Sequence, residues 1–158
     1  SIRIHGSGAD KYENVRIGIN GRLDTIQAAI LLEKLSIFDE ELKLRNIVAE
    51  YYINNIANNF KNPFIPKDYL SSWAQYSLLA NSELERNEIM STLSNLSIPS
   101  MIYYKCPLHL QTVFKILGYS KGDFPISEKV ASQIFSIPMH PYLDKDKQSK
   151  IIEILNTN

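Results

Sequence analysis

The sequence of 158 residues contains a single cysteine, Cys106. One thiol excludes an internal disulfide and a metal site built from several thiolates, so we expect a reduced, cytoplasmic protein. No histidine or aspartate arrangement beside Cys106 favours a nucleophile, and a packing role is expected for its side chain. The spacings of the three histidines, His5, His109 and His140, fit no metal-binding motif. No metal site is therefore expected.

Charge of one sign and long apolar runs are also lacking. The 17 Lys and Arg residues balance the 17 Asp and Glu residues, which argues against binding to a nucleic-acid backbone, because that requires a net basic face. The longest apolar run, Ala28 to Leu32, is too short to cross a bilayer. We therefore expect neither a nucleic acid nor a membrane as a partner.

The sequence has no initiator methionine and no recognisable signal peptide. It opens with an apolar stub that runs into a glycine-bearing loop, which is typical of an element whose beginning is missing. We interpret the chain as a piece of a longer protein. Apolar residues make up 44% and charged residues 22%, which is the composition of a folded domain rather than of a disordered chain.

The first sixty residues predict a loop over 5–19 and two helices. In the helix predicted over 23–35, apolar side chains occupy nearly every face, so the helix must be buried between surfaces that this chain alone can hardly supply. A longer helix is predicted over 38–60, and Pro63 and Pro66 follow it. Its single apolar stripe consists of Phe38, Leu42, Ala49, Tyr52, Ile53, Ile56 and Phe60.

The remainder alternates strands and helices, which predicts a small α/β unit. Ser82-Glu83-Leu84-Glu85 has the pattern of a capping box, and Asp144 is the expected cap of a terminal helix. Trp73-Ala74-Gln75-Tyr76 is expected in the core. The predicted elements are strands over 73–80 and 98–104, helices over 82–94, 109–117 and 127–134, and an extended stretch over 137–141.

Two glycines and an asparagine precede the first predicted helix, in Gly18-Ile19-Asn20-Gly21-Arg22-Leu23-Asp24. Asn20 is the candidate N-cap, and the free N–H groups of a first helical turn favour an anion. Arg22 at this end costs about 0.3–1 kcal/mol against the helix dipole, and a bound phosphate or carboxylate would offset that cost. In the alternative interpretation, Arg22 pairs with Asp24 or with solvent, and the helix is only capped.

A second candidate site follows the strand predicted over 98–104. Tyr103-Tyr104-Lys105-Cys106-Pro107-Leu108-His109 brings hydroxyl, ammonium and imidazole groups together in a proline-containing loop, where ligand-recognising groups often occur. In the alternative interpretation, one tyrosine is buried and the other exposed on a strand, and the histidine only makes structural hydrogen bonds.

Together, these motifs resemble those of the DegT/DnrJ-type nucleotide-sugar aminotransferases. The segment from Gly18 to Ala29 is similar to the family motif N-x-R-L/M-D-x-x-Q-A-A. Later motifs follow in the family order across essentially the whole chain. They are the long helix with Arg45, Trp73-Ala74-Gln75-Tyr76, Ile98-Pro99, Pro107-Leu108-His109-Leu110-Gln111, Phe124-Pro125-Ile126-Ser127-Glu128 and Ile137-Pro138-Met139-His140-Pro141.

The resemblance implies an α/β fold, the C-terminal part of the type I fold of pyridoxal-phosphate (PLP) enzymes. It implies the end of the large PLP-binding domain over 1–37, a linking helix over 38–62 and a small C-terminal α/β domain over 63–158. Members of this family are homodimers with active sites at the interface. They move an amino group from glutamate to a keto carbon of a nucleotide-linked sugar, with PLP as the electron sink.

The resemblance also assigns roles to residues. Asn20 matches the position that contacts the PLP phosphate in the neighbouring subunit's site, which favours the anion interpretation, and Arg22 is assigned to the phosphate or to an acidic group on the sugar. Tyr103, Tyr104 and His109 match the loop that lines the sugar pocket.

In the family, the Schiff-base lysine lies upstream of the matched region, and no lysine of this sequence lies in a matching segment. We therefore assign no catalytic residue and expect the isolated chain to be inactive. Two alternatives remain open: a non-catalytic binding or assembly module of the same fold, and a sugar dehydratase in which histidine replaces the lysine. Lys105 stands where many members have proline, which leaves the sugar preference open.

Overall fold

The structure is a computed structural model, and it describes residues 1–10, 13–57 and 59–157. The chain divides into two compact units, Ser1–Glu40 and Glu41–Asn158, and each is described by itself. The predicted loop and linking helix include Lys11, Tyr12 and Asn58, which lie outside the described residues. The domain boundaries at residues 37 and 62 stay predictions.

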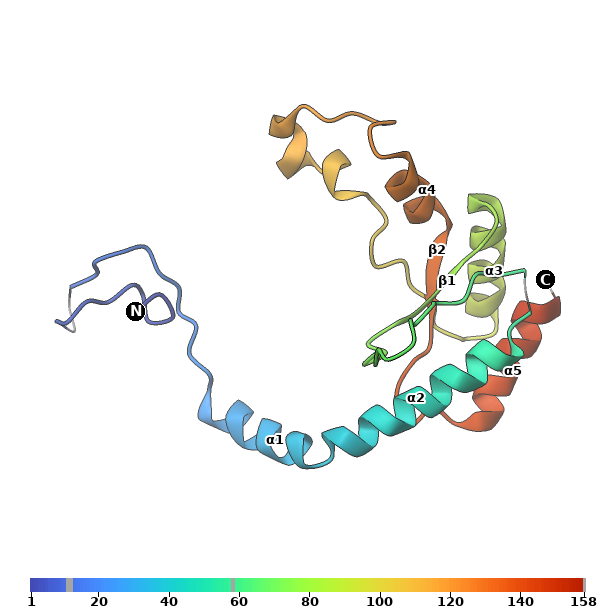
Figure 1. Cartoon of the computed structure of the whole chain (residues 1–158), viewed down its shortest axis with the longest axis horizontal. Helices are drawn as coiled ribbons and strands as arrows, with labels where there is room; N and C mark the ends of the chain where they lie inside the picture. Colours follow the sequence, from blue (N-terminus) through green and yellow to red (C-terminus); the bar gives the residue numbers. More distant parts are fainter. Residues whose placement is uncertain (11–12, 58, 158) are drawn as a thin grey trace. The chain divides into compact units, whose positions relative to one another are not determined.

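The first unit consists of paired extended segments followed by helix α1 (Thr25–Ser36) (Figure 1). The Ile19 amide donates to the Ile2 carbonyl at 2.9 Å, and the His5 amide donates to the Ile19 carbonyl at 3.0 Å. The two segments approach closely beside Gly18, where a Cβ atom would lie only 2.1 Å from the backbone nitrogen of Gly6. Position 18 therefore requires glycine.

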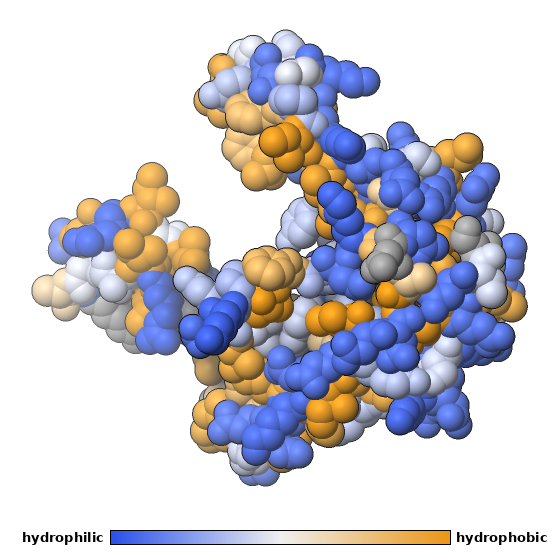
Figure 2. All heavy atoms as spheres, turned by 45° about the vertical axis from the view of Figure 1, so that its right-hand side comes forward, coloured by the Kyte–Doolittle hydropathy of each residue, from blue (hydrophilic) through white to orange (hydrophobic). Residues whose placement is uncertain are grey.

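Helix α1 has no buried residue. Its large apolar side chains range from 54% exposed at Leu31 to 73% exposed at Ile26, and apolar side chains are visible at the surface in Figure 2. The helix is apolar, as the sequence predicts. The described residues do not supply the surfaces that were expected to bury it.

The second unit holds the core. Side chains from helices and from both strands meet there, and the largest fully buried ones are Tyr52, Tyr76, Leu78, Ile89, Leu93, Phe135 and Leu155. The elements are α2 (Phe38–Asn55, which begins in the first unit), β1 (Tyr76–Leu79), α3 (Glu83–Asn95), α4 (Pro125–Gln133), β2 (Ile134–Ile137), α5 (Lys145–Thr157) and the 3₁₀ helices η1 (Leu108–Leu110) and η2 (Thr112–Leu117). Trp73 and Tyr76 are both buried, as expected for core residues.

Among the residues that the structure describes, the sheet has two strands, and their positions correct two predictions. Strand β2 pairs antiparallel with β1, with Tyr76 opposite Ile137. The sequence had predicted a helix up to residue 134 and only an extended stretch from 137, so this strand was missed. The strand predicted over 98–104 is wrong, because only Met101 pairs there, through a single bridge to Ser136. Pro99 has no N–H group for a ladder bond, which limits pairing along this segment.

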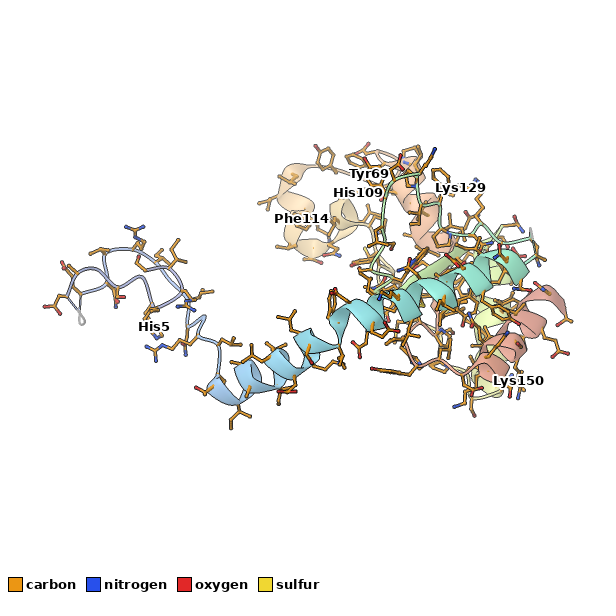
Figure 3. All side chains as sticks on the ribbon, turned by 60° about the horizontal axis from the view of Figure 1, so that its bottom comes forward. His5, Tyr69, His109, Phe114, Lys129 and Lys150 are labelled. Carbon is orange, nitrogen blue, oxygen red and sulfur yellow. The ribbon has the colours of Figure 1, made fainter. Side chains whose placement is uncertain are left out.

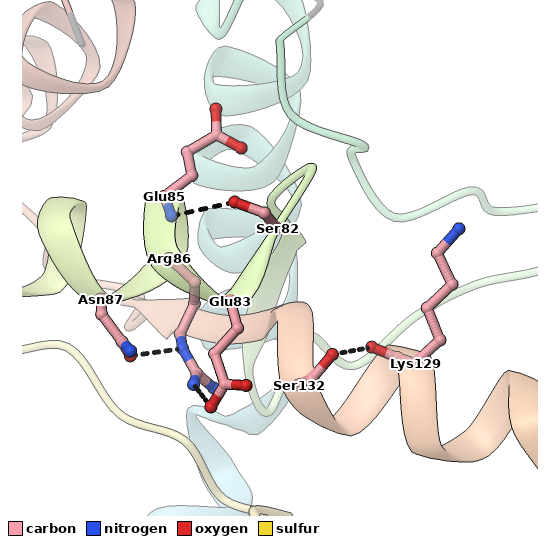
Figure 4. A network of polar contacts seen from close by, with 7 residues as sticks. All are labelled: Ser82, Glu83, Glu85, Arg86, Asn87, Lys129 and Ser132. Carbon is pink, nitrogen blue, oxygen red and sulfur yellow. Dashed lines mark hydrogen bonds and ion pairs between the residues drawn. The ribbon is translucent and has the colours of Figure 1, made fainter. Parts of the chain in front are cut away.

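The helix caps follow the sequence closely. The Ser82 hydroxyl accepts from the Glu85 amide at 3.1 Å, as a capping box predicts (Figure 4). The Glu85 carboxylate accepts from the Asn81 amide at 2.6 Å. In the usual capping box it would accept from the amide of the N-cap residue itself, here Ser82. Asp144 caps α5, since its carboxylate accepts from the Asp146 amide at 2.9 Å. Both helix starts are therefore fixed by local side-chain hydrogen bonds.

Helix α5 is joined to α2 by amide side chains, and the two helices lie side by side in Figure 1. The Gln148 side chain is buried and donates to the Val48 carbonyl at 2.6 Å. At the end of α2, the Asn156 side chain accepts from the Ala57 amide at 2.8 Å and donates to the Asn55 carbonyl at 2.9 Å. The bond to Asn55 satisfies one of the carbonyl groups that the C-terminal end of a helix leaves unpaired.

Candidate functional site

Asn20 and Arg22 lie on the extended segment that precedes α1. Asn20 forms an antiparallel bridge with Ile4, and the next amide, that of Gly21, donates to the Arg3 carbonyl at 2.8 Å. This pairing holds the backbone around Asn20 in an extended conformation.

The structure corrects the predicted start of the first helix. The N-cap is Asp24, not Asn20, and the Asp24 carboxylate accepts from the Ile26 amide at 2.8 Å. Asn20 cannot cap the helix, because it lies four positions before Asp24 and its backbone is paired with Ile4. Arg22 precedes the cap by two residues, so it does not oppose the dipole from within the first turn. The negative Asp24 already complements the helix end, and the case for an anion there no longer rests on the dipole.

The side chains of Asn20 and Arg22 nevertheless suit an oxyanion. Both residues are exposed, and within the described part of the chain neither side chain makes a hydrogen bond or an ion pair, including the alternative pair of Arg22 with Asp24. An amide N–H and a guanidinium are both donors, and the guanidinium can bind a phosphate through two parallel bonds. This donor set fits the phosphate of PLP.

The two tyrosines of the second candidate site are both exposed, at 55% for Tyr103 and 72% for Tyr104. The alternative in which one tyrosine is buried is therefore wrong. Neither hydroxyl bonds to another described residue. Tyr103 borders a hollow of about 190 Å³. The hollow is also lined by Ala74, Gln75, Pro99, Ser100, Met101, Ser136, Ile137, Pro138 and Met139. Cys106 is also exposed, so the expectation that it packs is wrong.

His109 has a different environment from the tyrosines. It lies on η1, close to Phe114 of η2 (Figure 3), and only 9% of it is exposed. The imidazole Nε2 lies 3.0 Å from Glu128 Oε1, and its ring is centred 4.8 Å from the ring of Phe124. His109 is thus packed against α4 and the loop before it. This agrees with the alternative interpretation, in which the histidine makes only structural hydrogen bonds.

Glu128 is the residue of this site that sequence reasoning did not single out. Its Oε1 also accepts from the Gly122 amide at 2.7 Å. This backbone bond, together with the bond to His109, holds the pKa of the Glu128 carboxyl below its usual range. The available signal was an acidic residue in the first turn of a helix that begins with Phe124-Pro125, but nothing in the sequence places it beside His109.

The site residues belong to two units. Asn20 and Arg22 lie in Ser1–Glu40, whereas the tyrosines and His109 lie in Glu41–Asn158. Over residues 1–10, 13–57 and 59–157, no cluster of three or more histidine, cysteine or acidic side chains could hold a metal ion. In the same residues, no helix is long and apolar enough to span a membrane.

Comparison with known proteins agrees with this fold. Residues 1–156 match the DegT/DnrJ/EryC1/StrS aminotransferase family. A UDP-2-acetamido-2-deoxy-3-oxo-D-glucuronate aminotransferase of Pseudomonas aeruginosa is 38% identical over 144 residues, which cover 90% of this chain and 38% of that protein.

Solved structures give the same result. A DegT DnrJ EryC1 StrS aminotransferase from Brucella abortus is 46% identical, with a TM-score of 0.88 over 99% of this chain and 41% of that one. Spr1654 from Streptococcus pneumoniae, solved in a PLP-form and a PMP-form, is 25% identical, with a TM-score of 0.86 over 99% of this chain and 41% of that one.

This chain belongs to the DegT/DnrJ/EryC1/StrS aminotransferase family. It has the α/β fold of part of such an enzyme, which confirms the fold class predicted from the sequence. The chain spans about two fifths of the length of the relatives that it matches.

Proposed function

We propose that this chain is the C-terminal part of a PLP-dependent aminotransferase that transfers an amino group from glutamate to a keto group on a nucleotide-linked sugar. The family match over residues 1–156 carries this proposal. Two relatives support the substrate class, since they are aminotransferases named for a UDP-linked and a dTDP-linked sugar. A cytoplasmic location belongs to the same proposal.

In this proposal, Asn20 and Arg22 bind the phosphate of PLP in the neighbouring subunit's site. Bound PLP supplies the electron sink that lets an amino group move between two carbon skeletons. The role of Asn20 and Arg22 is to hold and orient the phosphate, and the exposure and unpartnered state of their side chains support it. The Schiff-base lysine belongs to the upstream part of the enzyme.

The nucleotide sugar contacts the segment that carries Tyr103 and Tyr104. Both hydroxyls are exposed and have no bond to another described residue, so they are available to the hydroxyl groups of a sugar. The family resemblance adds His109 to this group, although its ring is turned to Glu128.

The enzyme is proposed to be a homodimer with its active site at the interface. Helix α1 supports a partner surface, because so many large exposed apolar side chains on one helix are unusual on a free monomer. These side chains are Ile26, Ile30, Leu31, Leu32 and Leu35.

The test uses the full-length enzyme that contains this chain. The enzyme is expected to show the absorbance of bound PLP and to aminate a UDP- or dTDP-linked keto sugar with glutamate. The isolated chain is expected to show neither property. A full-length protein that neither binds PLP nor transaminates would refute the proposal, and a PLP band from the isolated chain would refute the assignment of the lysine to the upstream part.

Variants test the phosphate contacts separately. Loss of a neutral hydrogen bond in Asn20→Ala should raise the Kd for PLP by roughly 2- to 12-fold, and loss of a charged one in Arg22→Ala by roughly 10- to 150-fold. Arg16→Ala is the matched control, since Arg16 is also exposed in the first unit. A Kd that stays at the control value in both variants would exclude these residues from the phosphate site.

A further inference from the structure

The segment that carries Tyr103 and Tyr104 is anchored at both ends. On one side, Met101 and Ser136 exchange two backbone hydrogen bonds, of 3.0 Å and 2.7 Å. On the other side, His109 contacts Glu128 at 3.0 Å. Ser136 lies in β2 and Glu128 in α4, and β2 follows α4 without a break. Both ends of the segment are therefore attached to one continuous stretch of the chain.

The second anchor is a compact group of side chains. The His109 side chain is 8% exposed and that of Glu128 is 15% exposed. Glu128 Oε1 accepts from the Gly122 amide as well as contacting the imidazole. The ring of Phe124 contacts both the imidazole, at 4.8 Å between ring centres, and the ring of Tyr119, at 5.0 Å. The imidazole thus contacts other side chains of the protein and presents little surface to a ligand.

Between the two anchors, the tyrosine side chains have no support of their own. Both are more than half exposed, and their hydroxyls bond to no described residue. The nearest side-chain hydrogen bonds start at Cys106: its Sγ donates to the Pro107 carbonyl at 3.6 Å, and its carbonyl accepts from the Gln111 side-chain amide at 3.4 Å. The placement of Tyr103 and Tyr104 therefore depends on the backbone. The backbone is held before them by the Met101 bridge and by Ile102, which packs against the core, and after them by the His109 anchor.

We propose that His109 and Glu128 form a positioning pair that places Tyr103 and Tyr104 against the nucleotide sugar and does not itself touch the sugar. This inference rests on the proposed function. It changes the role that the family resemblance assigns to His109, and it adds Glu128 to the residues on which substrate binding depends.

The experiment measures steady-state kinetics of the full-length holoenzyme with His109→Ala, Glu128→Ala and the double variant. Each single variant should raise KM for the nucleotide sugar by about tenfold, because misplacing binding groups by about 1 Å has effects of up to about 100-fold. KM for glutamate should not change. The double variant should raise KM for the nucleotide sugar no further than the single variants do, because both residues act through one contact. Glu128→Gln, which keeps the acceptor for the Gly122 amide, should restore part of the loss.

Glu88→Ala is the matched control, since Glu88 is an exposed residue of α3 outside the site. If His109 touches the sugar directly, His109→Ala raises KM while Glu128→Ala behaves like the control, and the proposal is wrong. If the pair only stabilises the fold, the variants lose active enzyme without any change in KM, which also overturns it.

A second readout does not depend on activity. Lys105 is exposed between the two anchors, so limited trypsin digestion after Lys105 reports how firmly the segment is held. Cleavage there should be several-fold faster in His109→Ala and Glu128→Ala than in Glu88→Ala. Equal cleavage in all three would refute the anchoring. Absence of transamination in the unmodified enzyme would refute the proposed function instead, and the two failures are thus distinguishable.

Discussion

Tyr52 joins α2 to the segment after β2, and its hydroxyl and ring can be tested separately. The side chain is fully buried, its ring lies 4.9 Å from that of Tyr76, and its hydroxyl donates to the Pro138 carbonyl at 3.0 Å. Tyr52→Phe removes only the hydroxyl, so the free energy of unfolding should fall by about 1 kcal/mol. Tyr52→Ala also removes the ring and leaves a cavity, so the loss should be about 3–5 kcal/mol.

Urea unfolding of the 158-residue chain, followed by circular dichroism, measures both losses. For a chain of this length, a loss of 1 kcal/mol corresponds to a fall in Tm of roughly 2–4 °C. Tyr69→Phe is the matched control, because Tyr69 is 74% exposed. Two results would contradict this reasoning. One is a loss in free energy of unfolding for Tyr52→Phe that is no larger than for Tyr69→Phe. The other is a loss for Tyr52→Ala that is no larger than for Tyr52→Phe.

Two further predictions concern the same unit. Ser82→Ala removes the N-cap of α3 and should lower the free energy of unfolding by about 0.5–2 kcal/mol in urea titrations, whereas the exposed Ser94→Ala should have little effect. Burial raises the pKa of Tyr52 and of Tyr76 above the ordinary 10.0. Because the folded state holds these protons more tightly, their contribution to stability is complete below pH 10 and is lost as the pH rises further. Tyr52→Phe should therefore make the stability less sensitive to pH above 10, and a pH dependence identical to that of the unmodified chain would contradict this.

The sequence predicted best those elements whose signals are local. The capping serine of α3 and Asp144 before α5 were correctly identified, because an N-cap depends on a side chain and on backbone groups two or three residues away. The three apolar residues predicted for this helix, Ile151, Ile152 and Leu155, are buried at the helical period for the same reason, and Gln148 and Ile154 are buried with them. These features require no knowledge of distant partners.

Strand pairing could not be predicted in this way. Residues 134–137 form a strand because β1 lies beside them, whereas residues 98–104 have similar apolar residues and make only the Met101 bridge. A short apolar run does not indicate by itself whether a partner strand is available. The choice between the two segments was made by the tertiary structure.

The candidate site shows the same limit. Asn20 and Asp24 are both capping residue types, and only the pairing of Asn20 with Ile4 decides between them. The sequence left open whether one of Tyr103 and Tyr104 is buried, and the structure shows both exposed. The contact of His109 with Glu128 joins residues 19 positions apart. A loop of irregular backbone leaves such a contact without any periodic signal.

The amide bonds between α5 and α2 have a consequence for biosynthesis. The carbonyl of Asn55, the last residue of α2, and the amide of Ala57 just beyond the helix are both bonded by a residue about 100 positions later, Asn156. During translation, α2 leaves the ribosome long before this partner exists, and its apolar stripe lacks α5 for the same interval. The second unit therefore completes its core only after α5 has also been synthesised, which makes early chaperone protection of α2 valuable during synthesis.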